Sequence, residues 1–112
     1  MNQPHPPLEL RTLQAAATDA CALLKMLANP DRLLLMCQLS QGELAVGELE
    51  EQLGIRQPTL SQQLGVLREN GLVSARRDGK SIYYSVASSQ ALAVMGVLYE
   101  QFCANADPEP TC

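Results

Sequence analysis

The chain has 112 residues, a formal net charge of −4 and an apolar content of 46%, which suit one globular domain and leave no room for a second. No apolar stretch approaches the roughly 20 residues that a membrane-spanning helix needs, and residues 1–7 lack the charged-then-apolar order of a secretory signal. The sequence therefore predicts a cytoplasmic protein with a disordered tail (1–7), a folded domain (8–105) and a flexible C-terminal tail (106–112).

The first three helices are predicted from apolar spacing and capping signals. An apolar stripe predicts a helix over residues 8–27. Asn29 can then cap a second helix, and Pro30 suits its first position, because that position needs no backbone N–H. We expect this second helix to end near residue 39 and a third helix to span residues 46–53.

The segment over residues 58–73 is the most informative part of the chain. Leu60, Leu64 and Leu67 recur at helical spacing and form an apolar inner face. The outer face is short, polar and uncharged, and such side chains can reach base edges in the major groove, whereas a purely solvated helix usually carries Glu and Lys. The alternative is an ordinary solvated helix. The predicted DNA contacts at this helix are Gln57, Thr59, Ser61, Gln62 and Gln63.

A basic β-hairpin is predicted directly after this helix. Residues 72–77 and 80–86 have the composition of two strands, and Asp78-Gly79 is expected to form their turn, because both residues tolerate positive φ angles. A helix-turn-helix followed by such a hairpin is a winged helix, so the predicted fold is mainly α with a β-hairpin wing. The cations predicted to contact phosphates are Arg68, Arg76, Arg77 and Lys80.

The acidic net charge is unevenly distributed along the chain. Residues 54–80 carry five basic and two acidic side chains, whereas the remainder carries three basic and ten acidic ones. Positive charge therefore concentrates where the predicted recognition helix and wing lie, as DNA binding requires.

The last helix is expected to begin after a Ser88 cap and to reach about Ala104. Its apolar face is broad, and the first helix carries a similar stripe. The sequence predicts a homodimer in which these two terminal helices pack against a second subunit. The alternative is that they close the core of the monomer. The apolar face comprises Ala91, Leu92, Met95, Leu98, Tyr99, Phe102 and Cys103.

Nearly the whole chain resembles the ArsR/SmtB family of winged-helix repressors. The resemblance is carried by the order of the elements, by the basic wing, and by residues 27–33 and 61–73. Gln63 departs from the family pattern, in which His is common at this position. The resemblance implies a homodimer that occupies a near-palindromic operator in double-stranded DNA, with half-sites roughly 34 Å apart, and leaves it when an inducer arrives.

The residues that bind metals in this family are missing from the aligned positions. Ala45 and Gly47 stand where metal sensors carry Cys in the third helix. The only histidine is His5, in the predicted tail, so the last helix lacks the His ligands of the other common metal site. The sequence predicts neither a bound metal nor a cofactor.

The four cysteines are Cys21, Cys37, Cys103 and Cys112. Scattered cysteines in a cytoplasmic chain are usually reduced core residues. However, Cys37 and Cys103 resemble, in position and spacing, the dithiol of the reactive-sulfur sensors of the BigR/SqrR type. The resemblance implies that a persulfide or polysulfide causes a bridge to form between these two thiols, and that the bridged protein then releases its operator. We expect Cys103 to be the more exposed thiol, because the end of a terminal helix frays readily.

Three other functions stay open. A thiolate sensor of arsenite or another soft metal would need Cys21 or Cys112 as a third ligand, although Cys21 is expected to pack in the core. An enzyme is not expected, because the chain has no CxxC pair, no Cys close to a His and no phosphate-binding glycine loop. In the third alternative, all cysteines are structural and dimer concentration alone regulates DNA binding.

Overall fold

The computed structural model describes residues 9–103. This range excludes both predicted tails, which contain His5 and Cys112. It also excludes the expected end of the last helix at Ala104. The described elements are, in chain order, α1 (Leu10–Leu27), α2 (Pro30–Leu39), β1 (Leu44–Ala45), α3 (Val46–Leu53), α4 (Thr59–Glu69), β2 (Val73–Asp78), β3 (Ser81–Val86) and α5 (Ser89–Phe102). The predicted winged helix-turn-helix is therefore confirmed.

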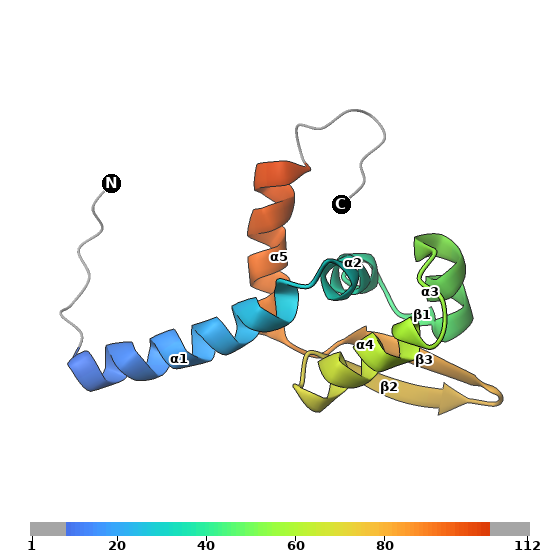
Figure 1. The fold of residues 1–112 in the computed structure, drawn as a ribbon, viewed down its shortest axis with the longest axis horizontal. Coiled ribbons are helices and arrows are strands. Elements are labelled where there is room, and N and C mark those ends of the chain that lie inside the picture. The colour runs from blue at the N-terminus through green and yellow to red at the C-terminus, as the bar shows by residue number, and fades with distance from the viewer. Residues whose placement is uncertain (1–8, 104–112) are drawn as a thin grey trace.

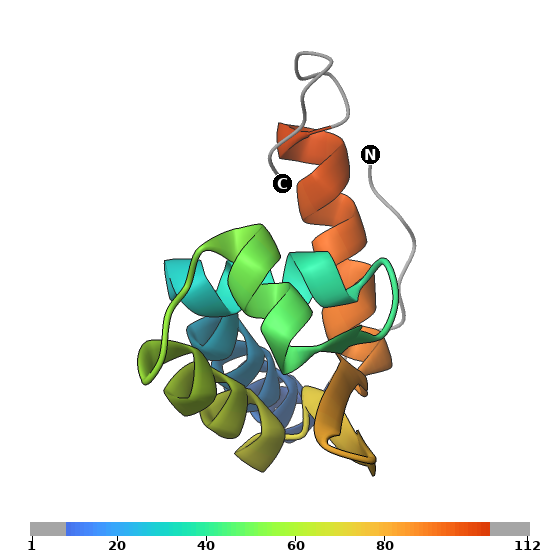
Figure 2. The same ribbon diagram turned by 90° about the vertical axis from the view of Figure 1, so that its right-hand side faces the viewer.

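The helices α2 and α3 lie above the β2–β3 hairpin, α4 lies beside it, and α1 and α5 extend away from this centre (Figure 1). The view turned by 90° shows α4 and the hairpin side by side at one end, opposite the far end of α5 (Figure 2). This arrangement leaves the recognition helix and the wing on a common side of the molecule.

Leucines from the three central helices form the core. Leu35 of α2, Leu49 of α3 and Leu64 of α4 are at most 1% exposed, and the expected inner face of α4 is confirmed. The hairpin and α5 complete this cluster. The buried apolar residues are Leu27, Leu35, Met36, Leu39, Leu49, Ile55, Leu60, Leu64, Leu67, Leu72, Val73, Ala91 and Met95.

The predicted helix starts are confirmed by their hydrogen bonds. The Asn29 side chain accepts from the backbone N–H of Arg32 at 3.0 Å, and Pro30 is the first residue of α2. The Ser88 hydroxyl accepts from the backbone N–H of Ala91 at 3.0 Å and caps α5. These caps satisfy N–H groups that have no partner within the helix.

The sheet has one strand more than the sequence predicted. The two-residue strand β1 pairs antiparallel with β3, Leu44 opposite Tyr84 and Ala45 opposite Tyr83, and the strand order is β1-β3-β2. A two-residue strand is too short to show an alternating pattern, and its partner lies far along the chain. Pairing with a distant strand therefore decides its conformation.

The hairpin turn lies one residue later than predicted. Asp78 pairs with Ser81 as the last ladder pair, so Gly79 and Lys80 form the turn. Of these two turn residues, only Gly79 has a positive φ, of +66°, which fits the two-residue turn that requires glycine at its first central position. The expectation that Asp78 adopts a positive φ was therefore wrong.

Large apolar side chains remain exposed on the two terminal helices. The exposed residues on α1 and α5 include Leu10, Leu13, Leu24, Leu92, Val97, Tyr99 and Phe102.

Within residues 9–103, no helix combines the length and the apolar character that crossing a membrane requires.

Candidate nucleic-acid interface and thiol site

The outer face of α4 carries the side chains predicted to read DNA. Ser61 and Gln62 are exposed and Thr59 is half-buried near the start of the helix. The side-chain oxygen of Gln57 accepts from the backbone N–H of Ser61 at 3.2 Å. Gln57 therefore caps the first turn of α4 from outside the helix, which occupies its oxygen while Ser61 and Gln62 face solvent.

Gln63 lies on the flank of α4 that faces the rest of the subunit. Its Oε1 atom accepts from Nη1 of Arg32 at 3.0 Å, and Gln63 is half-buried whereas Gln62 is exposed. The structure thus separates Gln63 from the exposed outer-face residues with which the sequence grouped it.

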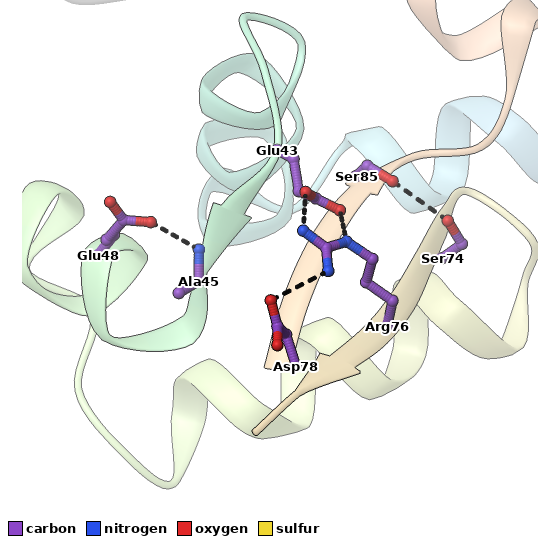
Figure 3. A network of polar contacts seen from close by, with 7 residues as sticks. All are labelled: Glu43, Ala45, Glu48, Ser74, Arg76, Asp78 and Ser85. Carbon is purple, nitrogen blue, oxygen red and sulfur yellow. Dashed lines mark hydrogen bonds and ion pairs between the residues drawn. The ribbon is translucent and has the colours of Figure 1, made fainter. Parts of the chain in front are cut away.

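The wing holds Arg76 in a network of polar contacts (Figure 3). The guanidinium donates two hydrogen bonds of 2.8 Å to Glu43 and lies 3.7 Å from Asp78. It also lies over the Tyr83 ring, 4.7 Å from the ring centre. The hydrogen bond from Arg76 lowers the pKa of Glu43, and the same bond raises the pKa of Arg76. Arg76 is therefore already paired with carboxylates.

The other predicted cations are exposed. Arg68 lies in the last turn of α4, Arg77 lies on β2 and Lys80 lies in the turn of the hairpin. These cations belong to α4 and to the β2–β3 hairpin, which lie side by side in Figure 2. This surface combines polar side chains for base edges with cations for phosphates.

A pocket of about 380 Å³ connects α2 with α5. Cys37 lines it from α2, and Met95, Gly96 and Tyr99 line it from α5. Cys103 follows Tyr99 by one turn, and its backbone N–H donates to the Tyr99 carbonyl at 2.8 Å. Cys37 and the turn of α5 that leads to Cys103 therefore line the same pocket.

Two expectations about the thiols were wrong. Cys103 is buried, with 8% of its surface exposed, whereas Cys37 is half-buried. Cys103 is the C-cap residue of α5, and its backbone N–H donates to the Tyr99 carbonyl in the last turn of the helix. Cys21 is exposed on α1 within the single subunit and does not pack in its core. Within residues 9–103, no three His, Cys, Asp or Glu side chains are grouped to hold a metal ion.

Comparison with known proteins places this fold in a family. Residues 29–75 match the bacterial regulatory proteins of the arsR family. A biofilm growth-associated repressor from Agrobacterium fabrum is 54% identical over 97 residues, which cover 87% of this chain and 83% of the relative. The chain belongs to the ArsR family. The predicted family is thereby confirmed, as is the prediction that the chain is a regulator and not an enzyme.

Solved structures of other ArsR-like proteins share the fold. The transcriptional repressor BigR from Xylella fastidiosa is 48% identical with a TM-score of 0.80, and the match covers 88% of this chain and 100% of that one. The homodimeric winged helix-turn-helix DNA-binding domain Mb0332 from Mycobacterium bovis is 34% identical with a TM-score of 0.66, covering 87% and 92% of the two chains.

The sequence did not predict the role of two charged residues that bind side chains of the candidate interface. Glu43 binds Arg76 of the wing, and Arg32 binds Gln63 of the recognition helix. Both contacts join residues more than 30 positions apart, 33 for the first pair and 31 for the second. Charged residues in such loops and first turns usually face solvent, so the sequence contained no local signal for either contact.

Proposed function

We propose that this ArsR-family chain is a dimeric DNA-binding transcriptional repressor that senses persulfide or polysulfide through Cys37 and Cys103. The observation that carries the sensing proposal is that Cys37 shares a pocket with the turn of α5 that precedes Cys103. Repression itself is supported by the relatives named as repressors, one 54% identical and one 48% identical with the same fold.

DNA reading is assigned to the exposed outer face of α4. Thr59, Ser61 and Gln62 can hydrogen-bond to base edges in the major groove, and Gln57 fixes the first turn that presents them. The exposed cations contact the phosphates on either side and set the position of the helix on the duplex. These phosphate contacts are Arg68, Arg77 and Lys80.

The dimer is assigned to α1 and α5. The large apolar side chains on these helices stay exposed in a single subunit, and burying them against the same face of a second subunit removes that surface from water. A relative of the same fold, Mb0332, is homodimeric. A two-fold dimer presents two α4 helices to a near-palindromic operator with half-sites roughly 34 Å apart.

The thiol chemistry balances without a metal or cofactor. One cysteine thiolate attacks the outer sulfur of a persulfide RSSH, forms a cysteine persulfide and expels RS⁻, which takes up a proton. The second thiolate attacks the inner sulfur and expels hydrosulfide. The two thiols are thereby oxidised to a disulfide, and the sulfane sulfur is reduced to sulfide. For the longer bridge, the cysteine persulfide first attacks the outer sulfur of a second RSSH and releases a second thiol RSH. The second cysteine thiolate then attacks the middle sulfur of the resulting CysSSSH and expels hydrosulfide, which leaves one additional sulfur between the two cysteines.

The length of the bridge provides a basis for selectivity. A direct disulfide needs Cα atoms about 4.4–6.8 Å apart, while an additional sulfur spans a wider gap. Either bridge ties α2 to α5, and α5 belongs to the proposed dimer face. DNA affinity falls if the bridged dimer holds its two α4 helices at a spacing or tilt that no longer fits the operator.

The test measures DNA release by the thiols. A duplex recovered from a random-sequence library with the reduced protein is titrated before and after anaerobic treatment with glutathione persulfide. We expect the wild type and the Cys21→Ser control to lose affinity on treatment, and the Cys37→Ser, Cys103→Ser double variant to keep it. Release by the double variant would contradict sensing through this pair.

A further inference from the structure

The guanidinium of Arg32 joins three helices. Arg32 lies in the first turn of α2, where Asn29 caps its backbone N–H. Its Nε donates to the carbonyl of Met26 at 2.7 Å and its Nη2 to the carbonyl of Lys25 at 3.2 Å. Both carbonyls belong to the last turn of α1. The remaining contact runs from Nη1 to Oε1 of Gln63 on α4, at 3.0 Å.

The chemistry of these groups makes the contact specific. The last carbonyls of a helix have no partner within it, so they accept from outside. A guanidinium offers five N–H donors in a rigid fork and no acceptor, so the atom of Gln63 that faces it must be the amide oxygen. Arg32 is half-buried, and hydrogen bonds from a charged donor are stronger than neutral ones.

The position of Gln63 on α4 agrees with an internal role. Gln63 lies three residues after Leu60 and four before Leu67, which both belong to the buried face. Gln62, its neighbour, points to the exposed side. The oxygen that Gln63 would need for bidentate recognition of adenine is therefore engaged by Arg32.

We infer that Arg32 and Gln63 form a tether that sets the orientation of α4 relative to the end of α1, and that Gln63 is a positioning residue and not a base contact. The inference rests on the proposed function, in which α1 belongs to the dimer interface. The tether then fixes the recognition helix relative to that of the second subunit, on which the fit to two half-sites depends.

Two substitutions at Gln63 distinguish a tether from a DNA contact. Gln63→Glu keeps an acceptor oxygen for Arg32 but would place a carboxylate against DNA if the side chain faced the duplex. Gln63→Met removes the acceptor without adding charge. Gln62→Glu is the matched control, because it adds the same charge on the exposed face. Affinity is measured for the library-selected duplex and for a scrambled duplex of equal length.

The tether predicts a definite order of affinities. Gln63→Glu binds the selected duplex within about threefold of the wild type, and Gln63→Met binds it about three- to tenfold more weakly, as loss of one hydrogen bond implies. Binding to the scrambled duplex stays unchanged for Gln63→Met, whereas a general loss of structure would lower both affinities. Gln62→Glu weakens binding to the selected duplex more than Gln63→Glu does.

The inference is overturned if Gln63→Glu binds more weakly than Gln63→Met, or if Gln63→Met binds as the wild type does. If Gln63→Met fails to fold, Arg32→Lys provides the second variant, because a lysine keeps the charge but cannot hold all three acceptors. The Arg32→Met, Gln63→Met double variant is expected to lose no more affinity for the selected duplex than whichever single variant, Arg32→Met or Gln63→Met, binds it more weakly. A wild type without sequence-specific binding would instead contradict the proposed function.

Discussion

Arg76 of the wing and Glu43 of the loop before β1 are joined by two parallel hydrogen bonds, from Nε to Oε2 and from Nη2 to Oε1, each of 2.8 Å. This pair ties the exposed hairpin to the body of the subunit (Figure 3). It also neutralises one of the cations that the sequence assigned to phosphate binding. If the wing contacts DNA as proposed, Glu43 and a DNA phosphate compete for the same guanidinium.

Replacing Glu43 with Gln is expected to strengthen non-specific DNA binding. The amide keeps the shape of the side chain but not its charge, so among the described residues Asp78, 3.7 Å away, is the one carboxylate still paired with Arg76 and the guanidinium binds a phosphate more readily. Affinity for a scrambled duplex rises at low salt, and its dependence on salt concentration steepens by about one counterion. Arg77→Ala, the control, makes the dependence shallower. Weaker binding by Glu43→Gln would show that the pair is needed to orient the wing.

The same pair predicts a pH dependence of stability. Because the hydrogen bond from Arg76 lowers the pKa of Glu43 in the folded state, the ionised carboxylate stabilises the fold fully above the ordinary Glu pKa. This contribution declines as the pH falls from that ordinary value through the lowered one. Urea unfolding of the wild type and Glu43→Gln should differ at neutral pH and converge in acid. A constant difference would contradict the role of the ionised pair.

The fold could be predicted where local signals agree with tertiary packing. Asn29 and Pro30 mark the start of α2, and the leucine spacing of α4 identifies its buried face, because capping and periodicity act within a few residues. The strand β1 could not be predicted, since two residues carry no period and only pairing with Tyr83 and Tyr84 makes them a strand.

The site could be predicted less completely than the fold. The sequence identified the polar outer face of α4 and the basic wing, but it did not distinguish Gln63 from Gln62 or Arg76 from Arg77. In each pair one member bonds to a residue distant in sequence: Gln63 to Arg32, and Arg76 to Glu43. Gln62 is also more exposed than Gln63, whereas Arg76 and Arg77 are both exposed. Such choices depend on long-range geometry that neither composition nor spacing records.

Leu64→Ala is expected to destabilise the recognition helix and with it the whole domain. Leu64 is 1% exposed in the central cluster, and truncating such a leucine costs about 2–5 kcal/mol of unfolding free energy. Gln62→Ala, two residues earlier on the exposed face, is expected to stay within about 0.5 kcal/mol of the wild type. Urea denaturation at one fixed protein concentration measures both. Equal stability of the two variants would contradict the described packing of α4.

A charge on the apolar faces of the terminal helices is expected to dissociate the proposed dimer. Leu13 is 51% exposed and Phe102 is 76% exposed in the single subunit, so Leu13→Glu and Phe102→Glu leave the core of the subunit intact. Both variants should sediment as monomers where the wild type sediments as a dimer, and bind the selected duplex more weakly. Gln101→Glu, on the same helix as Phe102, is the control. Dimers of both variants would place the interface elsewhere.

The central claim, a dithiol switch, is tested most directly by the intact mass of the reduced protein after anaerobic treatment with glutathione persulfide, followed by peptide mapping. We predict that Cys37 and Cys103 become linked, with a mass lower by two hydrogens for a disulfide, or with one retained sulfur for the longer bridge. Glutathione disulfide serves as the control reagent, because it has no sulfane sulfur and cannot supply the retained sulfur of the longer bridge. Persulfidation elsewhere with this pair unlinked, or an unmodified protein, would contradict the account.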